Sequence, residues 1–160
     1  MFDKLSSYNL VTNLVPGAIL AVALRSAGIP IVAASDIAGF AITSYALGSL
    51  TNRLGSIALD PVLLRMGFLP QRDYVAYVEA CNKDPKIENL VENANAFRTF
   101  SVGGILFFIV VALHQVTIYL GFTEKLNFFF VVLFFIIVFG LSYRRQNGYI
   151  VSRVNHHRAL

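Results

Sequence analysis

The segment 126–143 reads LNFFFVVLFFIIVFGLSY and contains no charged side chain. A helix built from it is apolar on every side, so none of its faces suits water. A bilayer core is crossed by about 20 apolar residues of α-helix, because each residue advances the helix by about 1.5 Å. We therefore interpret this segment as a membrane span that faces lipid.

The composition of the whole chain also indicates a membrane protein. Of its 160 residues, 56% are hydrophobic and 14% are charged. A soluble domain of this length has too little interior to bury so much apolar surface. The apolar residues come in blocks, and residues 1–160 are expected to form a single membrane domain. Its four expected spans lie at about residues 8–24, 31–59, 100–120 and 126–143.

Basic residues are distributed unevenly among the segments outside these spans. Of the 13 Lys and Arg residues, all except Arg25 and Lys125 lie in the N-terminus, in the 60–99 loop with its flanks, or in the 144–160 tail. Cytoplasmic loops of membrane proteins are enriched in Lys and Arg. We therefore expect both termini and the 60–99 loop to be cytoplasmic.

The first expected span is unusually polar. Asn9, Thr12, Asn13 and Pro16 recur at helical spacing and so lie on one face of a helix. An unsatisfied amide in hydrocarbon costs several kcal/mol, so this face is expected to contact protein or water. Alternatively, residues 2–13 form an interfacial helix and the span begins at Pro16.

The second expected span has a face of small and polar residues. Ser44 and Gly48 form a small-xxx-small pair, a spacing that lets helix backbones approach closely in lipid. Two interpretations remain open: a pore or oligomer seam, or ordinary packing against another helix of the same chain. The residues assigned to the pore or oligomer seam, from both spans, are Asn9, Thr12, Asn13, Ala41, Ser44, Gly48, Thr51, Asn52 and Gly55.

The 60–99 loop is expected to form a small helical collar. The Asp-Pro pairs at 60–61 and 84–85 are each typical of a helix N-cap followed by proline. A short helix is expected to begin after the first pair, to lie at the membrane interface, and to stop at Pro70. The helix after the second pair is expected to lead directly into the third span.

Nothing in the sequence is typical of a catalytic centre. The carboxylates are scattered along expected helices, and no Gly-rich phosphate loop occurs. His156 and His157 are adjacent and so point to different faces of a helix, which argues against a metal site. Cys81 is the only cysteine, which excludes an internal disulfide. We expect neither enzymatic activity nor a metal or other cofactor.

The cytoplasmic positive charges allow two interpretations. They fix the topology and contact anionic headgroups of the lipid bilayer, or they bind an anionic ligand such as a nucleotide or nucleic-acid oligomer through its phosphates. The candidate ligand-binding residues are Lys4, Arg65, Arg72, Lys83, Lys86, Arg98, Arg144 and Arg145.

Two segments, LSSYNLVTNLVPG at residues 5–17 and DPKIENLVENANAFRTF at residues 84–100, resemble the small membrane effectors of the bacterial Hailong antiphage-defence system. The resemblance implies a homotetrameric channel in the bacterial inner membrane, whose opening depolarises the infected cell. It also implies a cytoplasmic electropositive trench. That trench would bind a single-stranded DNA oligomer, made by a partner nucleotidyltransferase, that keeps the channel closed.

We therefore expect an all-α, homo-oligomeric integral membrane helical bundle with four transmembrane helices and a cytoplasmic collar. Its expected function is that of a toxic, ligand-gated ion-channel effector. The alternative is a non-channel membrane anchor or assembly subunit of a larger complex. A small transporter fits less well, because we expect no repeated half and no buried charge that could bind and move a substrate.

Overall fold

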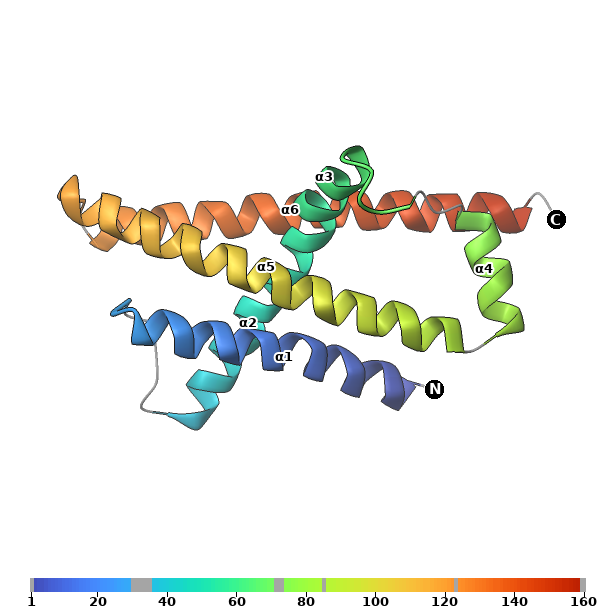
Figure 1. Cartoon of the computed structure of the whole chain (residues 1–160), viewed down its shortest axis with the longest axis horizontal. Coiled ribbons are helices and arrows are strands. Elements are labelled where there is room, and N and C mark those ends of the chain that lie inside the picture. Colours follow the sequence, from blue (N-terminus) through green and yellow to red (C-terminus); the bar gives the residue numbers. More distant parts are fainter. Residues whose placement is uncertain (1, 30–35, 71–73, 85, 123, 159–160) are drawn as a thin grey trace. The chain divides into compact units, whose positions relative to one another are not determined.

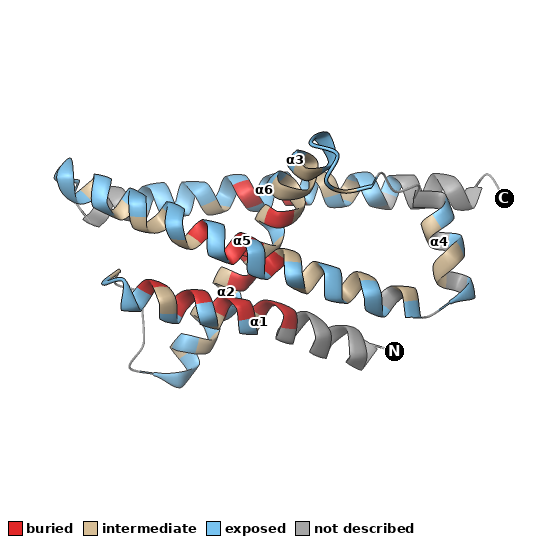
Figure 2. Ribbon diagram, viewed as in Figure 1, coloured by how far each residue is buried: buried red, intermediate tan, exposed pale blue. Residues whose placement is uncertain are grey.

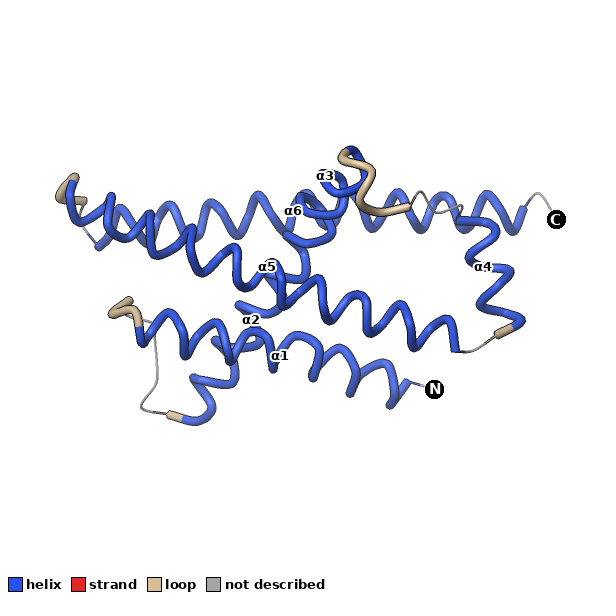
Figure 3. Tube along the Cα trace, viewed as in Figure 1, coloured by secondary structure: helices blue, strands red, loops and turns tan. Residues whose placement is uncertain are grey.

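The computed structural model describes residues 2–29, 36–70, 74–84, 86–122 and 124–158, and these residues form helices joined by short turns (Figures 1 and 3). The all-α prediction is therefore confirmed. The chain divides into two compact units, Met1–His114 and Gln115–Leu160. In chain order the elements are α1 (Phe2–Ser26), α2 (Ile37–Leu54), the π-helical segment η1 (Gly55–Leu59), α3 (Asp60–Arg65), α4 (Tyr74–Lys83), α5 (Lys86–Tyr119) and α6 (Glu124–Arg158).

Within the described residues, two helices are long and apolar enough to cross a membrane. The stretch Asn89–Tyr119 belongs to α5 and the stretch Phe129–Tyr149 to α6. These two stretches contain the third expected span and most of the fourth. The apolar stretch of α1, Thr12–Ser26, is shorter, and the number of four spans stays a prediction.

The first helix passes through its proline without a break. α1 extends from Phe2 to Ser26 with Pro16 inside it. The structure therefore differs from the alternative in which a new helix begins at Pro16. Thr12, Asn13 and Pro16 are all buried (Figure 2). Their burial agrees with the expectation that this polar face contacts protein or water, whereas the side chain of Asn9 lies outside the described part.

The small-residue face of α2 packs against α1. A Cβ atom added to Gly48 would overlap the backbone carbonyl of Asn13, and one added to Gly17 would overlap that of Ser44. Ser44, Gly48 and Thr51 are buried in this region. The close approach expected from the small-xxx-small spacing therefore occurs between two helices of one chain.

A short helix, α3, follows the Asp-Pro pair at 60–61 as expected, but Asp60 does not act as its N-cap. Asp60 has helical φ and ψ of −56° and −48°, and its N–H donates to the carbonyl of Gly55. The chain thus stays helical from α2 through η1 into α3. Proline lacks an N–H and is usually excluded from helix interiors. The wider turn of η1 immediately before Pro61 accommodates the missing hydrogen bond.

The end of α3 also differs from the sequence-based prediction. The helix ends at Arg65, not at Pro70. Gly67 has a φ of 72°, a left-handed conformation that residues with a side chain rarely adopt. The N–H of Phe68 donates to the carbonyl of Leu63 at 2.9 Å, which completes a Schellman-type C-cap.

The start of α2 is capped by Asp36, which lies near the outer end of the second expected span. The Asp36 carboxylate accepts from the N–H groups of Ala38 at 3.1 Å and Gly39 at 3.3 Å. The cap at Asp84 is as expected, since its Oδ1 accepts from the N–H of Lys86 at 2.9 Å. Both carboxylates satisfy backbone donors that the first helical turn leaves free.

Replacing Asp36 by alanine is expected to destabilise the first turn of α2 by about 1 kcal/mol, because both backbone donors lose their acceptor. Hydrogen–deuterium exchange at Ala38 and Gly39 measures this effect. Asp36→Ser is the matched control, since serine also caps helices and should preserve most of the protection. Equal exchange in the alanine and serine variants would contradict the capping role.

Candidate functional site: a polar cluster around Arg98

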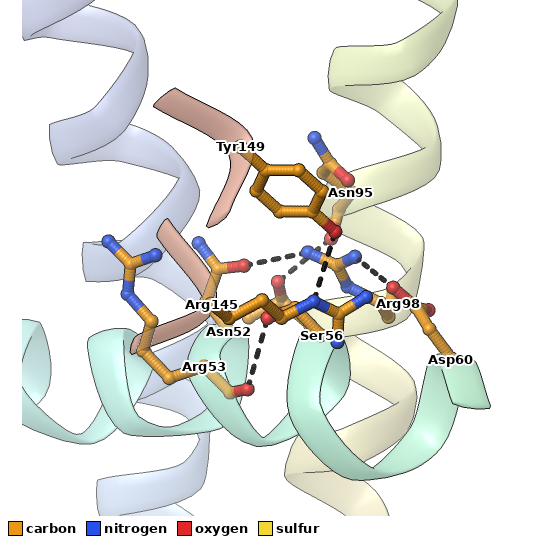
Figure 4. A network of polar contacts seen from close by, with 9 residues as sticks. Asn52, Arg53, Ser56, Asp60, Asn95, Arg98, Arg145 and Tyr149 are labelled. Atoms are coloured by element: carbon orange, nitrogen blue, oxygen red, sulfur yellow. Dashed lines mark hydrogen bonds and ion pairs between the residues drawn. The ribbon is translucent and has the colours of Figure 1, made fainter. Parts of the chain in front are cut away.

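Four polar side chains from four helices of the first unit form a connected cluster. Figure 4 shows three of them, Asn52, Asp60 and Arg98. The Arg98 cluster, as we name it, consists of Asn13 on α1, Asn52 on α2, Asp60 on α3 and Arg98 on α5. Its members are far apart in the sequence, so the cluster exists only when these helices are packed together.

Arg98 is the centre of the cluster. Its Nη1 donates to Oδ2 of Asp60 at 2.7 Å, and its Nη2 donates to Oδ1 of Asn52 at 3.0 Å. Asn52 then donates through Nδ2 to Oδ1 of Asn13 at 3.2 Å. The side chains of Arg98 and Asp60 are only 19% and 23% exposed. A charge-assisted hydrogen bond that is largely shielded from water is stronger than a neutral one.

The π-helical segment explains how Asn52 and Asp60 reach the same guanidinium. In a regular α-helix, residues eight positions apart differ in direction by roughly 80°, at about 100° per residue. The turn of η1 absorbs about one extra residue, which leaves the equivalent of seven α-helical steps and a difference of roughly 20°. The segment Gly55–Leu59 therefore aligns the amide and the carboxylate on one side of the continuous helical rod formed by α2, η1 and α3.

Gly55 provides room for the aliphatic part of Arg98. A Cβ atom on Gly55 would lie 3.0 Å from both Cγ and Cδ of Arg98 and 2.9 Å from its Nε. Contacts this short force a neighbour to move, and here that neighbour is held by Asp60 and Asn52. The Arg98 Nε is itself buried and has no hydrogen-bond partner among the described residues. The close contact with Gly55 thus forms one wall of the cluster.

The Arg98 cluster lies where the side chains along α5 change from mostly polar to mostly apolar. The residues before Arg98 include several charged and amide side chains, and those after it are mostly apolar from Phe100 onward. Arg98 lies within the candidate membrane stretch Asn89–Tyr119, and an ionisable group inside a membrane is costly unless it is paired. Arg98 and Asp60 together are neutral, so the pair satisfies this requirement within one chain.

The chemistry available here is binding and packing, without a reactive constellation. The cluster joins a guanidinium, a carboxylate and two amides, and it contains no nucleophile or histidine. In the part of the chain that the structure describes, no group of three or more His, Cys, Asp or Glu side chains is placed to hold a metal ion.

The predicted ligand-binding residues fall into three groups. Arg65, Lys83, Lys86 and Arg144 are exposed and available to an anion. Arg98 uses two of its donor nitrogens inside the cluster, and Arg145 donates to the hydroxyl of Tyr149 at 3.0 Å. The side chain of Lys4 and the whole of Arg72 lie outside the described residues.

The predicted pore or oligomer residues are brought together in the first unit. Asn13 and Asn52 belong to the Arg98 cluster, and Ser44 and Gly48 lie at the α1–α2 crossing. The remaining described members are Thr12 and Thr51, which are buried, Gly55, which lies against Arg98, and Ala41, which is half-buried. These contacts lie within one chain, and a role at a pore or between subunits stays a prediction.

Asp60 is the cluster member that sequence reasoning missed. It was assigned to a helix cap, because an Asp-Pro pair is common at helix starts. One clue was present: Asp60 is the only carboxylate in the segment 55–70.

The fold defines a class: an all-helical protein with two helices able to cross a membrane and a shielded ion pair in its first unit. In comparisons with family models, curated proteins and solved structures, nothing matches this chain. The resemblance to the Hailong effectors therefore stays a prediction from two short segments.

Proposed function

We propose that the chain is a ligand-gated, ion-channel-type membrane effector of bacterial antiphage defence. The Arg98 cluster is the observation that supports this best. It holds a charged pair and two amides at the edge of an apolar helix, where such groups commonly serve ion pathways. The proposal includes four spans, cytoplasmic termini and a homotetramer in the bacterial inner membrane, and its toxicity arises from depolarisation.

In the proposed mechanism, an anionic cytoplasmic ligand keeps the channel closed. A nucleic-acid oligomer or nucleotide would be held by phosphate contacts to exposed basic side chains. Lys83 at the end of α4 and Lys86 at the start of α5 are both exposed and three positions apart in the sequence. Because α5 continues from Lys86 through Arg98 into the apolar stretch, a ligand at this end acts on the same helix as the cluster.

A second function, a non-channel membrane anchor or assembly subunit, is favoured by a separate observation. Asn13, Ser44 and Gly48, which the channel hypothesis assigned to a pore or oligomer seam, contact one another's helices within one chain. Such packing gives these residues a structural role without any pore.

The membrane potential of bacteria expressing this chain alone separates the two functions. A voltage-sensitive dye should report rapid depolarisation if the protein is a channel effector without its closing ligand. The matched control is Gly104→Ala, because a Cβ on Gly104 meets no heavy atom within 4 Å and the variant should behave as the wild type. A normal potential with confirmed membrane insertion would favour the anchor function.

Neutralising Lys83 and Lys86 tests whether an anionic ligand closes the channel, in cells where that ligand is also present. Exposed charge pairs contribute up to about 1 kcal/mol each. The double substitution Lys83→Gln with Lys86→Gln should therefore lower the affinity for the ligand on the order of tenfold. The variant channel should then need more ligand than the wild type to stay closed, so depolarisation should persist at ligand levels that close the wild-type channel. Arg25→Gln, which removes an exposed charge on the opposite expected side, is the control. Identical behaviour of both variants would argue against a gate at these lysines.

A further inference from the structure

The C-terminal end of α3 exposes a group of large apolar side chains. Met66 is 74% exposed and Phe68 is 75% exposed, and Val62 and Leu64 on the preceding turn are also exposed. Arg65 lies among them and is exposed as well. We name these five residues the α3 tip. The hydrogen bond from the N–H of Phe68 to the carbonyl of Leu63 holds the turn in a defined conformation.

The Arg98 cluster determines where this tip lies along α5. Asp60, at the start of α3, is joined to Arg98, where the polar part of α5 meets its apolar part. Figure 4 shows the helix that bears Asn52, Ser56 and Asp60 crossing α5 steeply beside Arg98. If α5 passes through the bilayer, α3 therefore begins near the membrane surface. Arg65, the last residue of α3 and five positions after Asp60, lies roughly 8 Å along that direction at about 1.5 Å per residue. Phe68 lies beside this last turn, since its N–H donates to the carbonyl of Leu63.

The charge of the tip matches an anionic membrane surface. Asp60 is the only carboxylate among residues 55–70, and its charge is neutralised by Arg98. Arg65 is exposed beside apolar side chains and makes no ion pair within the described residues. Basic and large apolar residues on one short segment are typical of structures that lie in the headgroup region, with apolar groups below the phosphates.

We propose that the α3 tip docks into the anionic headgroup region of the membrane that α5 crosses. Met66 and Phe68 enter the boundary between headgroups and acyl chains, and Arg65 contacts lipid phosphates. The inference rests on one part of the proposed function, the passage of α5 through the membrane. It is independent of channel activity and of the second expected span, which the steep crossing of α5 by the helix that bears Asn52 does not favour. Docking here anchors the rod α2–η1–α3 at the level of the Arg98 cluster.

The sequence offers a direct probe, because the chain contains no tryptophan. Phe68→Trp places a single fluorophore on the tip, and Phe108→Trp places one on the apolar part of α5, where Phe108 is 72% exposed. Each full-length variant is reconstituted into vesicles of phosphatidylcholine and phosphatidylglycerol. The lipids are unlabelled, brominated near the headgroup, or brominated deep in the acyl chain.

The tip tryptophan at position 68 is expected to lose roughly half of its fluorescence to the shallow bromines, since interfacial segments lie about 5–10 Å into the boundary. The tryptophan at position 108 should be quenched most by the deep bromines. In the Phe68→Trp background, either Arg65→Gln or vesicles without phosphatidylglycerol should weaken the shallow quenching.

Two results would overturn the proposal, and they are distinguishable. Quenching at position 108 without quenching at position 68 means that the protein is inserted and the tip is in water or against protein. Absence of quenching at both positions means that α5 does not cross the bilayer, which removes the membrane placement of the proposed function as well.

Discussion

Asp60→Leu is expected to destabilise the first unit by about 3 kcal/mol, because it leaves the guanidinium of Arg98 largely buried without its counter-charge. This value is at the lower end for a broken buried pair, since about a fifth of each side chain is exposed. Thermal unfolding in detergent micelles should show a melting temperature lower by on the order of 10 °C.

The double variant Asp60→Leu with Arg98→Met provides the decisive comparison. Removing both charges eliminates the unpaired ion, so the double variant should be more stable than Asp60→Leu alone. Arg53→Met is the matched arginine control, because the Arg53 side chain is exposed and its loss should change the stability little. A double variant as unstable as the sum of both single variants would show that Asp60 and Arg98 do not interact.

Gly48→Ala is expected to destabilise the protein by about 2 kcal/mol, although alanine favours helices. The added Cβ would overlap the backbone carbonyl of Asn13, and overpacking of this kind costs up to about 3 kcal/mol. The gain in helix propensity returns only about 1 kcal/mol. Thermal unfolding measures the net loss.

Gly104→Ala is the matched control for this prediction. It makes the same chemical change in a helix, but a Cβ on Gly104 meets nothing within 4 Å. Its stability should therefore be unchanged or higher by up to about 1 kcal/mol. Equal effects of the two substitutions would show that α1 and α2 do not cross at Gly48.

Much of the fold follows from local patterns in the sequence. The apolar block after Phe100 and the spacing of apolar residues before it predict one long helix, and α5 is that helix. The buried face of α1 and the small-residue face of α2 were also predicted, since amides and small residues avoid lipid unless they contact protein. These patterns depend on helical periodicity, which a single sequence displays directly.

The Arg98 cluster could not be predicted in the same way. Its formation depends on a π-turn at Gly55–Leu59, and no residue pattern specifies where a helix takes up an extra residue. Asp60 and Arg98 are 38 positions apart, so no helical spacing relates them. The Asp-Pro pair was misread because its usual context is a helix start, whereas here the preceding turn already supplies the space that Pro61 needs.

The pairing of Arg98 has a consequence for the biogenesis of the protein under the proposed topology. During synthesis, α2 and α3 leave the ribosome before α5, and Arg98 has no partner until those helices meet. An unpaired arginine at the start of an apolar helix keeps that end in the cytoplasm while the span is inserted. After folding, Asp60 neutralises it. In the proposed topology, the same side chain thus directs the orientation of α5 first and later joins α5 to α3.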